Sequence, residues 1–138
     1  MVNINLLKQI CSFPGAPGFE HAIRSFLKDS LVDYCDDLQI DPMGNLIAFK
    51  KGRTDQKLML SAHMDEIGFI VQHIDDDGFI RFLPLGGFDP KTLTAQRVII
   101  HGQQDVIGVM GSKPIHLMTP DERNKAPLLK DYFIDTGL

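Results

Sequence analysis

The stretch Leu58–Phe69, which reads Leu-Met-Leu-Ser-Ala-His-Met-Asp-Glu-Ile-Gly-Phe, decides how the fold of this chain is interpreted. Its apolar first part, Leu58–Ala62, predicts a buried strand. His63 stands at the end of that strand, and Asp65 follows two residues later. A histidine that binds a metal through one ring nitrogen needs a hydrogen-bond acceptor for the other, and a carboxylate is a common one. The spacing therefore fits a metal-ligand histidine that is oriented by a carboxylate.

Each candidate residue also has a structural interpretation. A zinc site needs several protein ligands and His-x-Asp is a short motif, so His63 could instead be an ordinary histidine at a strand end. Asp65 could be a metal ligand, the acceptor for His63 or a turn residue. Glu66 could act as a base by its proximity, or it could be a solvated loop residue. His116 lies in a loop between prolines, where it could face a ligand or serve a structural role.

Composition narrows the class of protein. The chain has 138 residues, 43% hydrophobic and 23% charged, which is typical of a soluble protein with one domain or two small ones. A net charge of −4 gives no reason to expect nucleic acid or an acidic membrane as a partner. We find neither an apolar stretch of about 20 residues nor a signal-peptide pattern. We therefore expect a cytoplasmic protein with no membrane partner.

The chain before Ile67 has the pattern of an α/β structure. Apolar residues at helical spacing predict one amphipathic helix over residues 4–12 and a second over about 19–34. A turn that contains Pro42 and Gly44 separates a strand beginning at Leu38 from a return strand at Leu46–Phe49, and this pattern predicts a hairpin. Residues 1–66 therefore form the α/β part.

The pattern changes to that of strands from Ile67 onward. Apolar runs flank Asp75–Gly78, a strong hairpin turn, and a second pair of runs predicts another hairpin over residues 98–110. Residues 112–130 predict an irregular loop with one helical turn near 121–125. Residues 67–130 therefore indicate a small antiparallel barrel or sandwich. Tyr132–Asp135 then returns to a buried-strand pattern.

Short motifs occur in one order over almost the whole chain. They lie at residues 15–20, 41–46, 61–69, 77–80, 84–87, 96–98, 107–111, 114–118 and 134–137. Together they resemble the N-terminal part of the deblocking or glutamyl aminopeptidase family, which includes tetrahedral aminopeptidases and FrvX-like proteins, some of them labelled endoglucanase or cellulase M.

The resemblance implies a metallo-exopeptidase that removes N-terminal residues from peptides with a water activated by two divalent metal ions, zinc or cobalt. His63 would be the first metal ligand and Asp65 the carboxylate that orients it. The implied fold is part of a three-layer metallopeptidase-like α/β domain with an inserted, small antiparallel β barrel-like domain. Residues 1–66 would begin the catalytic domain, 67–130 would be the inserted module for homo-oligomer assembly, and 131–138 would return to the catalytic domain.

Family members are much longer than this chain. The bridging aspartate, the catalytic glutamate, the other carboxylate ligands and the second histidine all belong to the part beyond residue 138. We therefore expect the 138-residue chain alone to be inactive. The alternative is a non-catalytic oligomerisation module derived from such an enzyme, in which the α/β part has lost its role.

Overall fold

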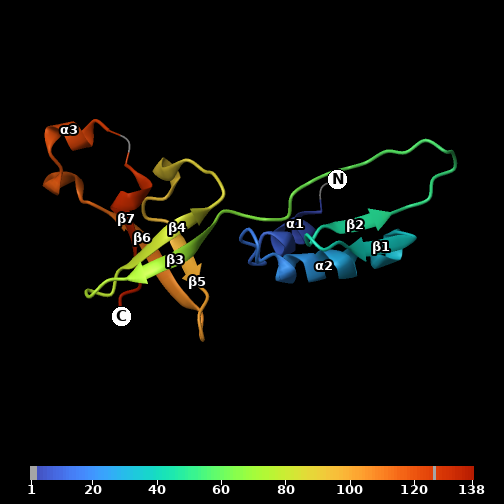
Figure 1. Cartoon of the computed structure of the whole chain (residues 1–138), viewed down its shortest axis with the longest axis horizontal. Coiled ribbons are helices and arrows are strands. Elements are labelled where there is room, and N and C mark those ends of the chain that lie inside the picture. Colours follow the sequence, from blue (N-terminus) through green and yellow to red (C-terminus); the bar gives the residue numbers. More distant parts are fainter. Residues whose placement is uncertain (1–2, 126) are drawn as a thin grey trace. The chain divides into compact units, whose positions relative to one another are not determined.

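In the computed structural model, which describes residues 3–125 and 127–138, the chain divides into two units. The first ends at Gly68 and the second runs from Phe69 to Leu138 (Figure 1). The two units differ in class, since the first combines helices with a hairpin and the second is built around a sheet. The predicted α/β class is confirmed.

Two helices begin the first unit. Helix α1 spans Ile4–Ile10, and the Asn3 side chain accepts a hydrogen bond from the backbone N–H of Leu6 at its start. Helix α2 spans His21–Leu31, and a short 3₁₀ turn, Val32–Tyr34, extends it. The prolines and glycines between the helices break the first one, as the sequence predicts.

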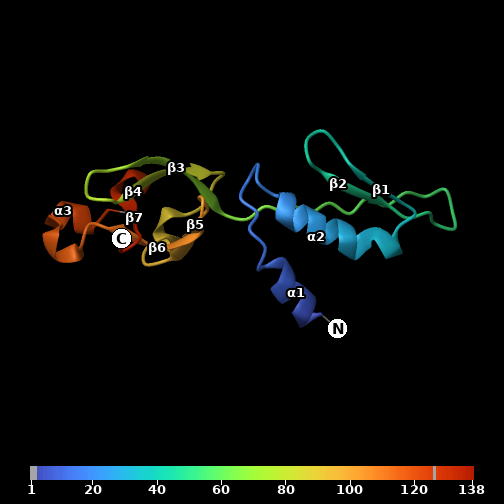
Figure 2. The same cartoon turned by 90° about the horizontal axis from the view of Figure 1, so that it is seen from below.

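A two-stranded antiparallel hairpin follows the helices in this unit. Strand β1, Asp37–Ile40, pairs with β2, Leu46–Phe49, so that Ile40 lies opposite Leu46 at the turn. Both views place α2 beside the hairpin (Figures 1 and 2). The predicted hairpin is confirmed.

The buried strand predicted at Leu58–Ala62 is wrong. This segment has no strand conformation, and the side chain of Leu60 is 88% exposed. A strand needs a neighbour that pairs with its backbone N–H and C=O groups. None of the strands in the described residues pairs with this segment, so its apolar side chains stay in solvent.

The second unit is a curled, five-stranded antiparallel sheet with the order β3-β4-β7-β6-β5. Its strands are β3 (Gly68–Ile74), β4 (Ile80–Leu85), β5 (Arg97–Ile100), β6 (Val106–Ser112) and β7 (Tyr132–Asp135). Both hairpins that the sequence predicts are present. The first turns at Gly78, whose φ of 85° favours glycine.

The core of the second unit lies on one face of this sheet. Its buried residues come from three strands and the loop before β5, namely Ile80, Phe82, Leu93, Met110, Tyr132 and Ile134. The Tyr132 hydroxyl lies 3.0 Å from the Thr94 hydroxyl, which satisfies the polar end of this buried ring. The chain thus buries an apolar core here without the first unit.

Strand β7 lies between β4 and β6, inside the sheet of the second unit. Pairing on both edges satisfies the backbone of β7 and buries Tyr132 and Ile134 in the core of the second unit. The expected return of residues 131–138 to a catalytic domain stays a prediction.

Within the described part of the second unit, short helical segments lie in the loops. They are Pro90–Thr92, Ile115–Leu117, Pro120–Arg123 (α3) and Leu129–Asp131. The helical turn predicted near residues 121–125 corresponds to α3. Among the described residues, no helix has the length and apolar character required to cross a bilayer.

Candidate functional site

The structure brings His63 and Asp65 together. The Nδ1 atom of the His63 ring lies 3.0 Å from the Oδ1 atom of Asp65 and 3.0 Å from its backbone oxygen. Both of these atoms are acceptors, so the ring forms the contacts by carrying its proton on Nδ1. In that tautomer Nε2 keeps a lone pair that can bind a metal ion. The side chains are 83% and 39% exposed, which leaves the pair open to a ligand.

The segment after His63 is held on the loop that precedes α2. The backbone N–H of Glu66 donates to the carbonyl of Gly15 at 2.8 Å. Gly68 approaches Ala16 so closely that a Cβ at position 68 would collide with it. Gly15 itself is buried against Ile23, the buried residue of α2. Helix α2 therefore supports the segment that carries His63. Gly15 and Ala16 on the preceding loop and Gly68 after His63 are small enough to allow this close packing.

A tight turn, Asp41–Asn45, lies on the other side of His63. The Asp41 carboxylate accepts hydrogen bonds from the backbone N–H groups of Met43 and Asn45, both at 2.9 Å, and from the Asn45 side-chain amide at 2.8 Å. The Asn45 amide is the main reason why the pKa of Asp41 lies below its ordinary value. Asp41 therefore stays ionised and keeps the turn closed near neutral pH.

A small pocket lies between these parts of the first unit. It has a volume of about 150 Å³. Its lining residues are Glu20, Met43, Gly44, Asn45, Ala62, His63, Met64 and Asp65. The pocket thus places the His63–Asp65 pair against the Asp41–Asn45 turn, which is more than fifteen residues earlier in the sequence. Sequence reasoning identified the turn but not its proximity to His63.

The donor set of this pocket does not complete a metal centre. Within residues 3–125 and 127–138, no three His, Cys, Asp or Glu side chains converge on one point. His63 contributes one imidazole with its orienting carboxylate, and the side chain of Glu66 is exposed. A catalytic zinc ion takes three protein ligands, and a pair of ions takes more. The residues of this chain therefore do not fit a two-metal site by themselves.

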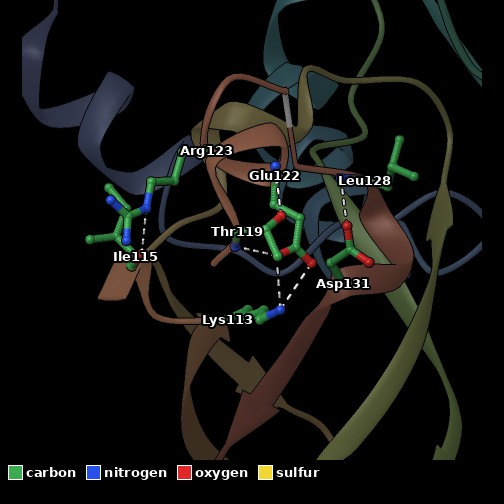
Figure 3. Close-up of polar contacts among 7 residues, drawn as sticks. All are labelled: Lys113, Ile115, Thr119, Glu122, Arg123, Leu128 and Asp131. Atoms are coloured by element: carbon green, nitrogen blue, oxygen red, sulfur yellow. Dashed lines mark hydrogen bonds and ion pairs between the residues drawn. The ribbon is translucent and has the colours of Figure 1, made fainter. Parts of the chain in front are cut away.

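His116 belongs to the second unit and is exposed in the 3₁₀ turn Ile115–Leu117. A polar cluster braces the surrounding loop (Figure 3). Lys113 contacts the Glu122 carboxylate at 2.9 Å, and the Thr119 N–H donates to the same carboxylate. Arg123 donates to the carbonyl of Ile115. The loop is therefore held by defined contacts, and a ligand role for His116 stays a prediction.

Comparison with known families identifies the chain. A family model described as M42 glutamyl aminopeptidase matches residues 44–138. The chain belongs to this family. The match includes the turn residues Gly44 and Asn45 and the His63–Asp65 pair. The family resemblance inferred from the motifs is confirmed.

Known relatives agree with this assignment. A lysyl aminopeptidase of Pyrococcus furiosus is 44% identical over 119 residues, which cover 85% of this chain and 34% of that protein. The crystal structure of a TET aminopeptidase from a marine sediment archaeon of the Thaumarchaeota matches with a TM-score of 0.86 and 34% identity, over 97% of this chain and 38% of that one.

A third relative is the TET1 peptidase of Pyrococcus horikoshii, described as assembling into a tetrahedron or a large octahedral shell. It matches with a TM-score of 0.78 and 32% identity, over 97% of this chain and 40% of its own. The chain spans about a third of the length of the curated relatives it matches.

Proposed function

We propose that this chain is the N-terminal part of a cytoplasmic, metal-dependent aminopeptidase that removes N-terminal residues from peptides. The observation that carries the proposal is the contact of His63 Nδ1 with the Asp65 carboxylate, in a segment covered by the family match. The activity named for the relatives supports the same reaction class. Peptides are therefore the proposed substrates.

His63 is the proposed first ligand of a pair of divalent ions, zinc or cobalt. Asp65 would hold the proton on Nδ1 and fix the plane of the ring, so that Nε2 faces the ion. When bound, the ions would supply an activated water for peptide hydrolysis. The other ligands and the general base would come from residues outside this chain, because the described residues do not converge on a complete ligand set.

Residues 67–130, most of which belong to the second unit, are the proposed assembly module of a homo-oligomer. Ile99 and Ile107 lie opposite each other on β5 and β6 with exposed side chains, and Val109 extends this apolar patch along β6. Exposed apolar patches of this kind favour association. The assembly described for the Pyrococcus horikoshii relative supports the proposal. The same patch favours the alternative function, a non-catalytic oligomerisation module.

A light-scattering measurement tests the assembly step. The 138-residue chain is expected to rise above its monomer mass of 15.5 kDa as its concentration increases. Ile107→Lys should reduce this association, because it places a charge in the patch. A monomer at every concentration would contradict the assembly role.

A chimeric enzyme tests the catalytic role. Residues 1–138 replace the aligned segment of the Pyrococcus furiosus lysyl aminopeptidase, and hydrolysis of amino-acid p-nitroanilides is measured with added zinc or cobalt. The chimera is expected to be active and to lose at least a hundredfold in kcat/KM with His63→Ala, which removes a metal ligand.

His101→Ala is the matched control for this experiment. His101 also contacts a carboxylate through Nδ1, that of Asp105 at 2.9 Å, but it belongs to the hairpin of the second unit. This variant should keep the activity of the chimera. An inactive chimera with intact folding, or equal losses in the two variants, would refute the catalytic role of His63.

A further inference from the structure

Met43 lines the pocket, but the proposed metal chemistry gives it no role. Its side chain is 87% exposed at the tip of the Asp41–Asn45 turn, although it lines the same pocket as His63. Large apolar side chains gain by leaving water, and Met adapts its shape to whatever covers it. A methionine held at the rim of a pocket is therefore suited to contact an apolar group that enters the pocket.

The turn that carries Met43 is rigid. Besides the bonds to the Asp41 carboxylate, the backbone N–H of Gly44 donates to the Asp41 carbonyl at 3.0 Å, and the N–H of Asp41 donates to the Asn45 carbonyl at 3.1 Å. Gly44 has a φ of 88°, a conformation that favours glycine. Met43 is therefore presented in a fixed place and not on a mobile loop.

Arg24 ties this turn to helix α2. Its Nη1 donates to the carbonyl of Gly44 at 3.0 Å, in a partly buried contact that spans twenty residues of sequence. A Cβ at position 44 would come within 2.6 Å of the same guanidinium nitrogen, so the two groups are closely packed. Helix α2 also carries Ile23, which packs on Gly15 and thereby supports the His63 segment. One helix thus positions both walls of the pocket.

From this geometry we propose that the Asp41–Asn45 turn is the specificity wall of the site. Met43 contacts the side chain of the N-terminal residue that is removed, and Arg24 is the positioning residue that sets the distance between the wall and His63. The inference rests on the proposed function. The pocket volume of about 150 Å³ suits one amino-acid side chain, and the Met43 and Met64 side chains in its lining favour contact with an apolar one such as that of leucine.

The test measures substrate selectivity in the chimera described above, as the ratio of kcat/KM for leucine p-nitroanilide to that for alanine p-nitroanilide. Met43→Ala is expected to lower this ratio on the order of tenfold, the usual effect of losing apolar contact with a substrate side chain. Arg24→Ala should lower the same ratio, and Arg24→Lys should restore part of it. Arg53→Ala and Met118→Ala are the controls, since neither residue lines the pocket.

A purely structural role for Arg24 predicts a different result. Loss of folded enzyme lowers kcat for both substrates equally and leaves their ratio unchanged. An active chimera whose ratio is unaffected by Met43→Ala or Arg24→Ala would overturn the specificity wall while leaving the proposed function intact. A folded but inactive chimera would overturn both.

Amide hydrogen exchange of the 138-residue chain tests the anchoring step without any catalysis. Arg24→Ala should speed exchange at the amides of Gly44 and Asn45 on the order of tenfold, because one charge-assisted hydrogen bond to the turn is lost, whereas Arg53→Ala should leave them unchanged. Equal exchange in Arg24→Ala and in the unsubstituted chain would overturn the role of Arg24.

Discussion

The core of the second unit can be tested at a single residue, Met110. Its side chain is 1% exposed, and it belongs to the buried cluster that Ile80, Phe82 and Tyr132 also form. Strand β6, which carries Met110, pairs with β5 on one side and with β7 on the other. Replacing Met110 by alanine keeps this backbone pairing and removes most of the side chain. The perturbation is therefore confined to packing.

The structure sets the expected magnitude. Truncating a buried methionine to alanine costs about 2–5 kcal/mol of unfolding free energy, because transfer energy is lost and a cavity remains. The second unit, residues 69–138, has 70 residues, and at roughly 0.05–0.15 kcal/mol per residue its total stability is about 3.5–10 kcal/mol. The midpoint of thermal unfolding should fall by roughly 8–40 °C. Met110→Ala is therefore expected to remove a large share of the stability of this unit, and to unfold it where the starting stability lies at the low end of that range.

Hydrogen exchange followed by mass spectrometry resolves this effect by segment. Peptides from β4 and β7 should exchange faster in Met110→Ala, while the β1–β2 hairpin of the first unit should keep its protection. Ile74→Thr is the matched control in the same sheet, since Ile74 on β3 is 62% exposed and lies outside the apolar patch of Ile99, Ile107 and Val109. The control should change stability by about 0.5 kcal/mol or less. If Met110→Ala lowers the unfolding free energy by less than about 1 kcal/mol, or if both variants lower it equally, the assignment of the core face is refuted.

Three further predictions concern the chain by itself. The 138-residue chain should not hydrolyse amino-acid p-nitroanilides with zinc or cobalt, and turnover that survives repurification and disappears in His63→Ala would contradict this. Calorimetry at neutral pH should find only weak zinc binding, because one imidazole leaves most coordination positions to water; a tight stoichiometric site lost in His63→Ala would mean that further residues complete it. The hydrogen bonds from the Thr119 backbone and from Lys113 lower the pKa of Glu122 from 4.5 to about 2. The Glu122 carboxylate therefore stabilises the fold above pH 4.5 and loses this effect as the pH falls toward 2. The stability difference between the unsubstituted chain and Glu122→Gln should therefore shrink over that window in thermal unfolding scans, and a constant difference would contradict the role of Glu122.

Local sequence signals predict much of this fold, because the elements concerned are determined by neighbours in the chain. The turn at Asp75–Gly78 is one example, since the Asp75 carboxylate accepts from the N–H of Phe79 and Gly78 adopts the positive φ that the turn requires. The contact between His63 and Asp65 is also local, and the proximity inferred from their spacing is present in the structure.

Features that depend on distant residues were not predictable in the same way. The pocket joins Met43 and Gly44 to His63, and nothing in the spacing of these residues indicates that they meet. The contact arises because α2 supports both segments, through Arg24 on one side and Ile23 on the other. Strand β7 is a similar case. Its apolar pattern indicates that it is buried, but it does not indicate that β7 pairs with β4 and β6.

The segment Leu58–Ala62 shows what an apolar pattern can and cannot specify. A run of apolar residues can form a buried strand only if another strand is present to pair with it. The run itself does not show whether such a strand is present. In this structure the segment is exposed, although leaving residues such as Leu58 and Leu60 in water forgoes about 25 cal/mol per Å² of apolar surface. Since the chain matches about a third of the length of its relatives, the proposed function assigns the missing partner strand to the remaining part of such an enzyme. Pairing with that strand would then fix the backbone immediately before His63, so that burial of the apolar segment and placement of the proposed first metal ligand would depend on the same contact.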